Sequence, residues 1–525
     1  MYDLLIKRAT VIDGTGQESF VADIGISDGR IIDIALDIPV KAKEVIEAEG
    51  LVLTPGFVDV QNHSDSYWSL FDSPNLDSLV LQGITSVLVG NCGTSLAPLL
   101  SRNALKSSQK WHDLTGSNFN WSSFGEFVDT LGSQNFGTNI GSLVGLSTLR
   151  RGLLGDQQRS LTSEEVEILG RALQDSIEAG AFGLSTGLSY SHEFAVSELE
   201  LYELAKIITA YNALLSVHLR NEAEGLPESV EEALEVAQKS GSRLKLSHFK
   251  VRGKSNWHQL SEVLQRIENV VHMGADISLD VYPYTSTWQP LYTYLPKWAI
   301  SGGRAAMLKI LGDPAQYKKI LAHLHASQNP IAELIVASTS FNMRVVSKNL
   351  GQIAQNLGVS SEEALLEVLR NGGTEVLVFD HCLNADQVEE LLAHPLSVVG
   401  TDGGGFPLLH QGQHVSKLVH PRCFGTTSSF IAQMRHSKRI SLEAAIAKLT
   451  SLPARVWGLA DRGQISVGAV ADLVLFDPLH THDRATIQNP YRAPQGIHKV
   501  WVNGALVASE GQLTGIRSGT FLRKE

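Results

Sequence analysis

Residues 214–250 read LLSVHLRNEAEGLPESVEEALEVAQKSGSRLKLSHFK. Two short apolar runs, LLSVHLR and RLKLSHFK, flank a charged segment with the pattern of an amphipathic helix. Apolar runs of this kind are typical of strands buried on both faces, as in a parallel sheet covered by helices. The runs carry His218 and His248 towards their ends. The stretch therefore predicts a strand–helix–strand unit whose strands end in polar side chains.

The same alternation fills the middle of the chain. Capping-box patterns, in which Ser or Thr is followed three residues later by Glu, mark helix starts at Thr162, Ser197 and Ser360. Eight β/α units predict an α/β fold of the TIM (β/α)8 barrel type. The eight runs are GFVDVQNH (56–63), ITSVLVGNCG (84–93), NIGSLVGL (139–146), GAFGLSTG (180–187), LLSVHLR (214–220), RLKLSHFK (243–250), ISLDVYPY (277–284) and LSVVGTDGG (396–404).

The two ends of the chain alternate apolar and polar residues instead. DLLIKRATVIDGTG (3–16) and KVWVNGALVASEGQLTG (499–515) predict short antiparallel strands, the second pair joined by a turn at Asn503-Gly504. We expect residues 1–54 and 461–525 to form one small sheet module beside a barrel at 55–460.

The last two runs of the barrel are separated by more than a hundred residues. We expect part of this gap, about 286–345, to be an inserted subdomain near the carboxyl ends of the strands. The gap also contains the apolar runs ELIVAS (333–338) and EVLVFD (375–380), and either of them is an alternative barrel strand.

Composition excludes several classes of protein. The 525 residues include 43 Lys+Arg and 55 Asp+Glu, and the net charge of −12 argues against a nucleic-acid or membrane-binding surface. Three cysteines exclude a disulfide scaffold. The N-terminus lacks the pattern of a secretory signal, so we expect a cytoplasmic protein.

Polar side chains follow the apolar runs, where a buried strand has no structural need of them. The carboxyl ends of barrel strands meet at one face, where active sites lie. A single histidine at a strand end is more often structural than a ligand, but five metal-binding side chains at five strand ends favour a metal site. One thiol, three imidazoles and one carboxylate suit zinc. The five are His63, Cys92, His218, His248 and Asp402.

Other candidates rank lower. The neighbouring His381 and Cys382 follow an apolar run and are a weaker rival pair. We expect most of the remaining histidines in loops and helices to be solvated or structural, namely His192, His258, His272, His394, His410, His414 and His420.

Along nearly its whole length the sequence resembles the N-acyl-D-amino-acid deacylase (D-aminoacylase) family of the amidohydrolase superfamily. The cysteine of GNCG is the specific marker, because most other amidohydrolases bridge two metals with a carboxylated lysine. The resemblance implies a TIM barrel, a small β-sandwich domain from both termini and an insert between the last barrel strands. It rests on TPGFVDV (54–60), VGNCG (89–93), LVGLSTLR (143–150), AFGLSTGLSY (181–190), SVHLRNE (216–222), LSHFK (246–250), DVYPYT (280–285), GTDGG (400–404), HPRCFGT (420–426), LTSLPARVWGL (449–459) and ADLVLFDP (471–478).

The resemblance also implies roles for individual residues. Cys92, His218 and His248 match a tightly bound zinc site, His63 matches the second histidine of an H-x-H motif, and Asp402 matches the catalytic aspartate. Lys250 follows His248 by two residues, which would place both on one side of a strand. The positions that hold the substrate's carboxylate and acyl carbonyl are matched by Tyr190, Lys250, Tyr282 and Arg422.

Two positions depart from the family pattern. Gln61 replaces the first histidine of H-x-H, and glutamine is a poor zinc ligand beside imidazole. A second metal site made of Gln61, His63 and Asp402 should therefore be weak or empty. Leu146 stands where the family usually has a polar residue, so the substrate preference stays open.

The expected reaction is zinc-dependent hydrolysis of N-acyl-D-amino acids, which are small molecules with a free carboxylate. Asp402 would take a proton from water and give it to the leaving amine. Alternatives are hydrolysis of another C–N or ester bond, such as a cyclic amide or a dipeptide, and an inactive amidohydrolase-fold interaction protein. The sequence leaves the oligomeric state open.

Overall fold

The computed structural model describes residues 1–107, 119–327, 329–409 and 417–525. Two of the histidines considered above, His410 and His414, lie outside these residues. Among the described helices, none is both long and apolar enough to cross a lipid bilayer.

Parallel strands form the centre of the molecule and follow one another in chain order. One sheet runs β6-β7-β8 and another β9-β10-β11-β12-β13-β17, and only Leu143 separates β8 from β9. Backbone bonds from His63 to Gly403 (2.7 Å) and from Asp402 to Gln61 (2.8 Å) join the end of β17 to the end of β6. The strands therefore make a ring, and their carboxyl ends meet on one side. They are β6 (Phe57–Asp59), β7 (Ile84–Val89), β8 (Asn139–Ser142), β9 (Val144–Gly145), β10 (Gly183–Gly187), β11 (Leu214–His218), β12 (Arg243–Leu246), β13 (Ile277–Val281) and β17 (Ser397–Val399).

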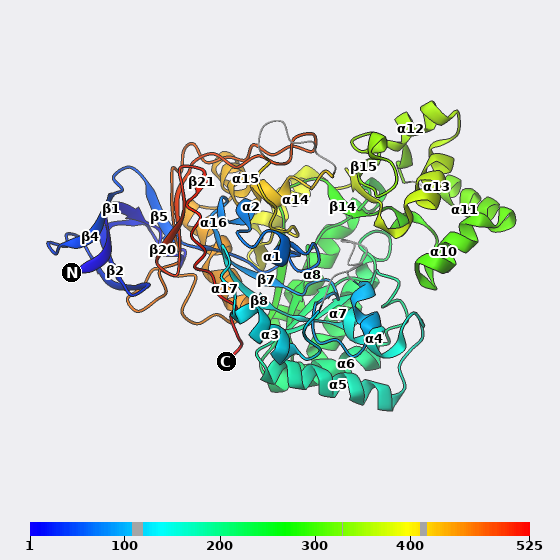
Figure 1. Ribbon diagram of the computed structural model, residues 1–525, viewed down its shortest axis with the longest axis horizontal. Coiled ribbons are helices and arrows are strands. Elements are labelled where there is room, and N and C mark those ends of the chain that lie inside the picture. Colours follow the sequence, from blue (N-terminus) through cyan, green and yellow to red (C-terminus); the bar gives the residue numbers. More distant parts are fainter. Residues whose placement is uncertain (108–118, 328, 410–416) are drawn as a thin grey trace.

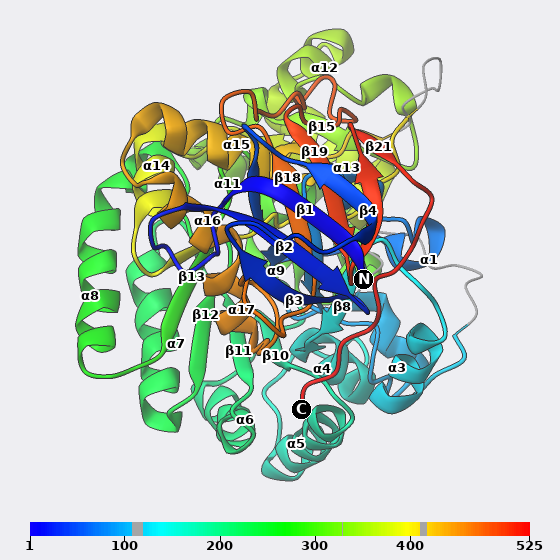
Figure 2. The ribbon, with the colours of Figure 1, turned by 90° about the vertical axis from the view of Figure 1, so that its left-hand side faces the viewer.

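Helices cover the outside of this ring, as Figure 2 shows for α5 to α8 around β10 to β13. Their apolar faces pack on the strands in one continuous core. Thr162 and Ser360 form the predicted capping boxes, but Ser197 caps its helix in one direction only, because the side chain of Glu200 pairs with Arg150 at 2.5 Å. The helices are α1 (Ser69–Asp72), α2 (Asp77–Val80), α3 (Phe124–Gly132), α4 (Leu146–Leu154), α5 (Ser163–Glu178), α6 (Glu198–Ala210), α7 (Leu226–Ser240), α8 (Leu260–His272), α14 (Ala385–Ala393), α15 (Arg422–Ser437), α16 (Leu442–Leu449) and α17 (Ser451–Trp457).

Both ends of the chain build a single sheet at one end of the molecule (Figure 1). Its order is β21-β20-β19-β18-β5-β1-β2-β3, with β4 paired to β1. The predicted turn at Asn503-Gly504 joins β19 to β20, and both residues have the positive φ that a tight hairpin turn requires (49° and 80°). The strands are β1 (Tyr2–Val11), β2 (Phe20–Ser27), β3 (Arg30–Ala35), β4 (Ala42–Glu47), β5 (Val52–Pro55), β18 (Leu473–Phe476), β19 (Ile497–Val502), β20 (Ala505–Ser509) and β21 (Gln512–Leu513).

A separate unit with its own hydrophobic core lies at the other end of the molecule (Figure 1). It reaches Asp380, further than the limit near residue 345 that we expected, because both extra apolar runs, at 333–338 and 375–380, pair antiparallel in its small sheet. Neither run joins the parallel strands, and β17 follows β13 there. The unit contains β14 (Thr287–Pro290), α9 (Lys297–Ile300), α10 (Gly303–Gly312), α11 (Pro314–Ala326), β15 (Ile335–Ser338), α12 (Leu350–Leu357), α13 (Ser361–Gly372) and β16 (Leu377–Asp380).

Candidate metal centre

Three buried side chains meet where β7, β11 and β12 end. The ligand atoms of Cys92, His218 and His248 lie within 4.8 Å of one another. Cys92 Sγ is 3.3 Å from His248 Nε2, and the two imidazole rings meet edge to face with centroids 4.4 Å apart. The structure thus brings together three residues from distant parts of the chain, since Cys92 and His248 are 156 positions apart in sequence. A thiol and two imidazoles are a donor set that fits zinc.

A second group shares the same sulfur. His63, Cys92 and Asp402 also bring their ligand atoms within 4.8 Å of one another. His63 Nε2 lies 3.1 Å from Asp402 Oδ1, and Arg422 Nη1 lies 2.9 Å from Asp402 Oδ2. The carboxylate of Asp402 therefore stands between an imidazole and a guanidinium.

The local charges set the protonation states of the centre. Burial raises the pKa of Asp402, but Arg422, His248 and His63 together outweigh burial, and the pKa lies well below its ordinary value. Burial also opposes ionisation of Cys92, whereas the positive charge of His248 and hydrogen bonds from His218 and His248 lower its pKa well below the usual range. Burial lowers the pKa of His218, which favours the neutral imidazole. Burial and the charge of Lys250 lower the pKa of His248, but the charges of Asp402 and Cys92 outweigh them and raise it to about 10. A metal binds the neutral imidazole, so metal binding would displace that proton.

Glu222, which was not among the predicted site residues, contacts both His248 and Lys250. Its Oε1 lies 3.1 Å from His248 Nδ1 and accepts a hydrogen bond of 2.6 Å from Lys250 Nζ. Nδ1 of His248 lies between this carboxylate and Lys250 Nζ, which is 2.8 Å away, while Nε2 faces Cys92. Asp280 fixes the same residue through its backbone, accepting from the N–H of His248 at 2.8 Å.

Gln61 faces the centre with its amide. Its Nε2 donates to Cys92 Sγ at 3.2 Å, and its Oε1 accepts a bond of 2.6 Å from Lys245 Nζ. Gln61 and Lys245 are both completely buried. Lys245 lies inside an apolar run and was not among the predicted site residues.

The predicted substrate-binding side chains surround the centre. The ring of Tyr190 lies 5.0 Å from that of His218, and the guanidinium of Arg422 lies 4.9 Å from the ring centroid of Tyr282. Lys250 is bonded to Glu222 and to the carbonyl oxygen of His248 (2.8 Å). β12 ends at Leu246, so a turn, not the alternation of a strand, brings Lys250 beside His248.

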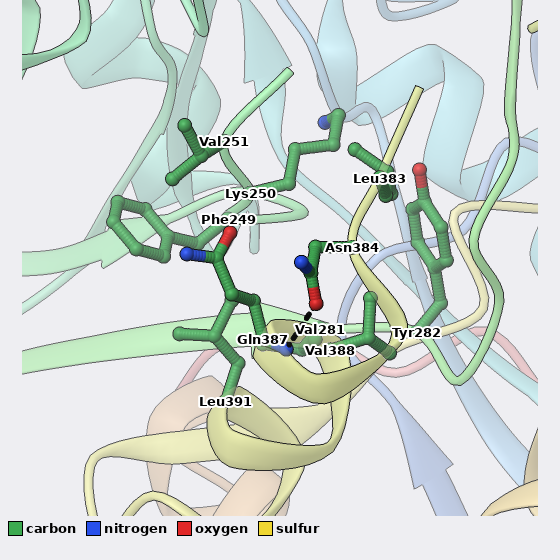
Figure 3. A pocket seen from close by; sticks show the side chains of 10 residues that line it. All are labelled: Phe249, Lys250, Val251, Val281, Tyr282, Leu383, Asn384, Gln387, Val388 and Leu391. Atoms are coloured by element: carbon green, nitrogen blue, oxygen red, sulfur yellow. Dashed lines mark hydrogen bonds between the residues drawn. The ribbon is translucent and has the colours of Figure 1, made fainter. Parts of the chain in front are cut away.

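A small cavity borders Lys250 and Tyr282 on the side of α14 (Figure 3). Its other walls are mostly apolar, and its volume of 10 Å³ suffices for about one water. A substrate must therefore approach these two side chains from another side.

The lower-ranked candidates that the structure describes do not belong to the two ligand groups. His420 is buried, bonded through Nε2 to Ser286 Oγ (2.8 Å), and accepts the N–H of Arg422 on Nδ1 (3.1 Å). It is a structural histidine at the start of α15. Within the described ranges, neither His381 nor Cys382 joins a group of potential ligands.

Curated relatives match the chain in sequence over nearly its full length. The chain is 32% identical over 525 residues to an N-acyl-D-glutamate deacylase of Alcaligenes xylosoxydans xylosoxydans, covering 100% of this chain and 97% of that protein. The chain belongs to the N-acyl-D-amino-acid deacylase family of amidohydrolases. A D-aminoacylase of the same organism is 30% identical over 524 residues, covering 100% and 98% of the two chains.

Other comparisons agree with membership of the deacylase family. Residues 361–508 match the model of the amidohydrolase family. A solved D-aminoacylase superposes with a TM-score of 0.84 at 28% identity, and the N-acyl-D-glutamate deacylase of Bordetella bronchiseptica, complexed with zinc and a phosphonate inhibitor that mimics the tetrahedral intermediate, with 0.83 at 30%. Each comparison covers 100% of both chains.

Proposed function

We propose that this chain is a zinc-dependent hydrolase that cleaves the amide bond of N-acyl-D-amino acids to a carboxylate and a free amino acid. The observation that carries the proposal is the cluster of Cys92, His218 and His248 beside the Asp402–Arg422 pair. The deacylases that match over the full length support the substrate class.

Cys92, His218 and His248 would hold the zinc ion. Their burial and their two chemically distinct donor types fit zinc better than calcium or magnesium, which prefer oxygen ligands. Bound zinc polarises a carbonyl and lowers the pKa of water from ~15.7 towards ~7.

Asp402 would move the proton. Because Arg422, His248 and His63 together keep its pKa low, the group is a carboxylate at neutral pH, the form that can accept a proton from the attacking water. It would then deliver that proton to the amine nitrogen, which leaves poorly as an anion. His63 holds one oxygen of Asp402, and His63 or Tyr190 would donate to the developing oxyanion.

The substrate's carboxylate would bind to Arg422, Lys250 and Tyr282. Arg422 offers a planar set of donors suited to a carboxylate. The buried hydroxyl of Tyr282 has no hydrogen-bond partner among the described residues, so it is available to a ligand. Lys250 would share its ammonium between Glu222 and the substrate.

We interpret the ring of parallel strands as the TIM barrel and the sheet from both termini as the β-sandwich domain of this family. The boundaries proposed for these parts are residues 1–54 and 461–525 for the terminal domain and 55–460 for the barrel. The insert is proposed to run from β14 to β16, as its separate core suggests.

The test is a panel of paired N-acetyl-D- and N-acetyl-L-amino acids with acidic and apolar side chains. We expect release of the free amino acid from D substrates only. Equal cleavage of both enantiomers, or cleavage restricted to cyclic amides or esters, would contradict the proposal. An absence of turnover by zinc-loaded protein would favour an inactive interaction protein.

A further inference from the structure

Lys245 is a buried ammonium inside the ring of strands. Its Nζ donates to Val60 O (2.8 Å), Gln61 Oε1 (2.6 Å) and Asn91 Oδ1 (3.2 Å), and it forms an ion pair with Asp280 at 3.1 Å. An ammonium has three N–H groups, and all three are used here. The acceptors lie on β13 and on segments that follow β6 and β7, so Lys245 is held from several directions.

Lys245 determines which way the amide of Gln61 points. A lysine ammonium only donates, so the amide must turn its oxygen to Lys245. Its NH2 group is then directed to Cys92 Sγ, at 3.2 Å. The reversed amide would set NH2 against an ammonium and the carbonyl oxygen against sulfur. At this position the chain therefore presents a hydrogen-bond donor to the metal centre.

A donor at this point opposes a second cation. The group of His63, Cys92 and Asp402 contains only three side chains and depends on the same sulfur as the first group. The N–H of Gln61 lies against that sulfur and cannot bind a cation. A further positive charge, that of Lys245, stands directly behind Gln61.

We propose that Lys245, acting through Gln61, restricts this centre to one metal ion. The inference rests on the proposed function for its chemical meaning: Asp402 is then not a ligand of a second cation and can take part in proton transfer. Lys245 and Gln61 are positioning residues in this proposal, and neither touches the substrate.

The variant Q61H tests the polarity argument. A histidine that binds a metal through one nitrogen carries its proton on the other and needs an acceptor there. Lys245 offers only donors, so the introduced imidazole would accept from Lys245 and carry its proton on the nitrogen that faces the centre. Q61H alone should therefore gain no second ion. In Q61H/K245Q the glutamine oxygen accepts the ring N–H, and a second ion should bind.

The readout is the number of zinc ions per chain, measured by elemental analysis after loading with excess zinc and gel filtration. We expect one ion for the natural chain, one for Q61H and two for Q61H/K245Q. The matched control is Q61H/K448Q, which removes another buried lysine, bonded to His394 O (2.5 Å) and Ser397 O (2.8 Å), and should keep one ion. Cobalt absorption spectra give an independent count.

Two results would overturn the inference: two tightly bound zinc ions in the natural chain, or the same count in Q61H and Q61H/K245Q. If loss of the partner of Asp280 prevents folding, Q61H/K245Q/D280N removes both charges, keeps the glutamine acceptor and carries the same expectation. Hydrolysis of N-acetyl-D-amino acids is scored separately. Its absence would contradict the proposed function and leave the metal count to decide this inference.

Discussion

Asp402→Asn removes the proposed proton acceptor and leaves Cys92, His218 and His248 unchanged. General acid–base catalysis by one side chain contributes about 10²–10⁴-fold, equivalent to roughly 2.7–5.5 kcal/mol of transition-state stabilisation. Asp402 is a carboxylate at neutral pH because its pKa is low, and asparagine replaces that carboxylate with a neutral amide of the same size. We therefore expect kcat to fall by that factor while one zinc ion stays bound.

The same substitution also costs stability. Arg422 is buried, and its contact with Asp402 at 2.9 Å joins two opposite charges. Loss of a hydrogen bond to a buried charged group costs about 1–3 kcal/mol. Asp380→Asn is the matched control, because Asp380 is a second buried carboxylate, located in the insert. It accepts a hydrogen bond from Tyr294 (2.6 Å) and lies 3.5 Å from Arg252. It should lose similar stability and keep its turnover.

The assay compares the two variants with the natural chain by kcat, zinc content and denaturant unfolding. Asp402→Asn should have a much lower kcat than Asp380→Asn, whereas the zinc content and the free energy of unfolding of the two variants should be similar. If Asp402→Asn retains zinc and its turnover stays within about tenfold of the natural chain, below the range expected for an acid–base group, Asp402 is not the proton acceptor. If zinc is lost as well, Asp402 is a ligand of the tight site.

Three further substitutions probe the neighbourhood of the centre. Cys92→Ala should leave the chain without tightly bound zinc, and an undiminished zinc content would remove Cys92 from the ligand set. Glu222→Gln should weaken zinc binding or activity about 10–100-fold, because a neutral amide no longer balances Lys250 or orients His248, and chelator competition with a pH–rate profile would detect this. Burial raises the pKa of Asp65 from 3.8 to about 6, so this group favours the folded state below pH 3.8 and that advantage is lost as the pH rises through 6. Asp65→Asn should therefore raise the free energy of unfolding at pH 8 by up to ~3 kcal/mol, with little gain near pH 4, and an equal gain at both values would refute the assignment.

The sequence predicted which residues meet at the centre because a ring of parallel strands brings strand ends that are distant in the chain close together. His218 and His248 each follow an apolar run, and parallel strands bring such ends to one face. Cys92 and Asp402 follow from the same rule. No contact had to be known in advance, only that the runs are strands and that the strands are parallel.

The supporting residues could not be predicted in the same way. Lys245 lies in an apolar run, and its role follows from its contacts with Gln61 and Asp280, which are far from it in sequence. Glu222 lies in a loop, where a glutamate is ordinarily solvated. The insert was underestimated for a related reason: the runs at 333–338 and 375–380 have the composition of buried parallel strands, and only their antiparallel partners distinguish them.

Backbone conformation at the centre adds an argument that residue types alone do not supply. Cys92, His248 and Asp402 have φ values of 54°, 38° and 48°, in the left-handed region that β-carbons disfavour. Each such residue costs of order 1–3 kcal/mol when the surrounding structure holds it there. Glycine would avoid that cost, and Gly90 and Gly93 adopt positive φ on either side of Cys92. Three residues of the centre thus hold a conformation that lowers stability, and strain of this kind, placed among proposed ligands and beside the proposed proton acceptor, favours a functional role for their side chains.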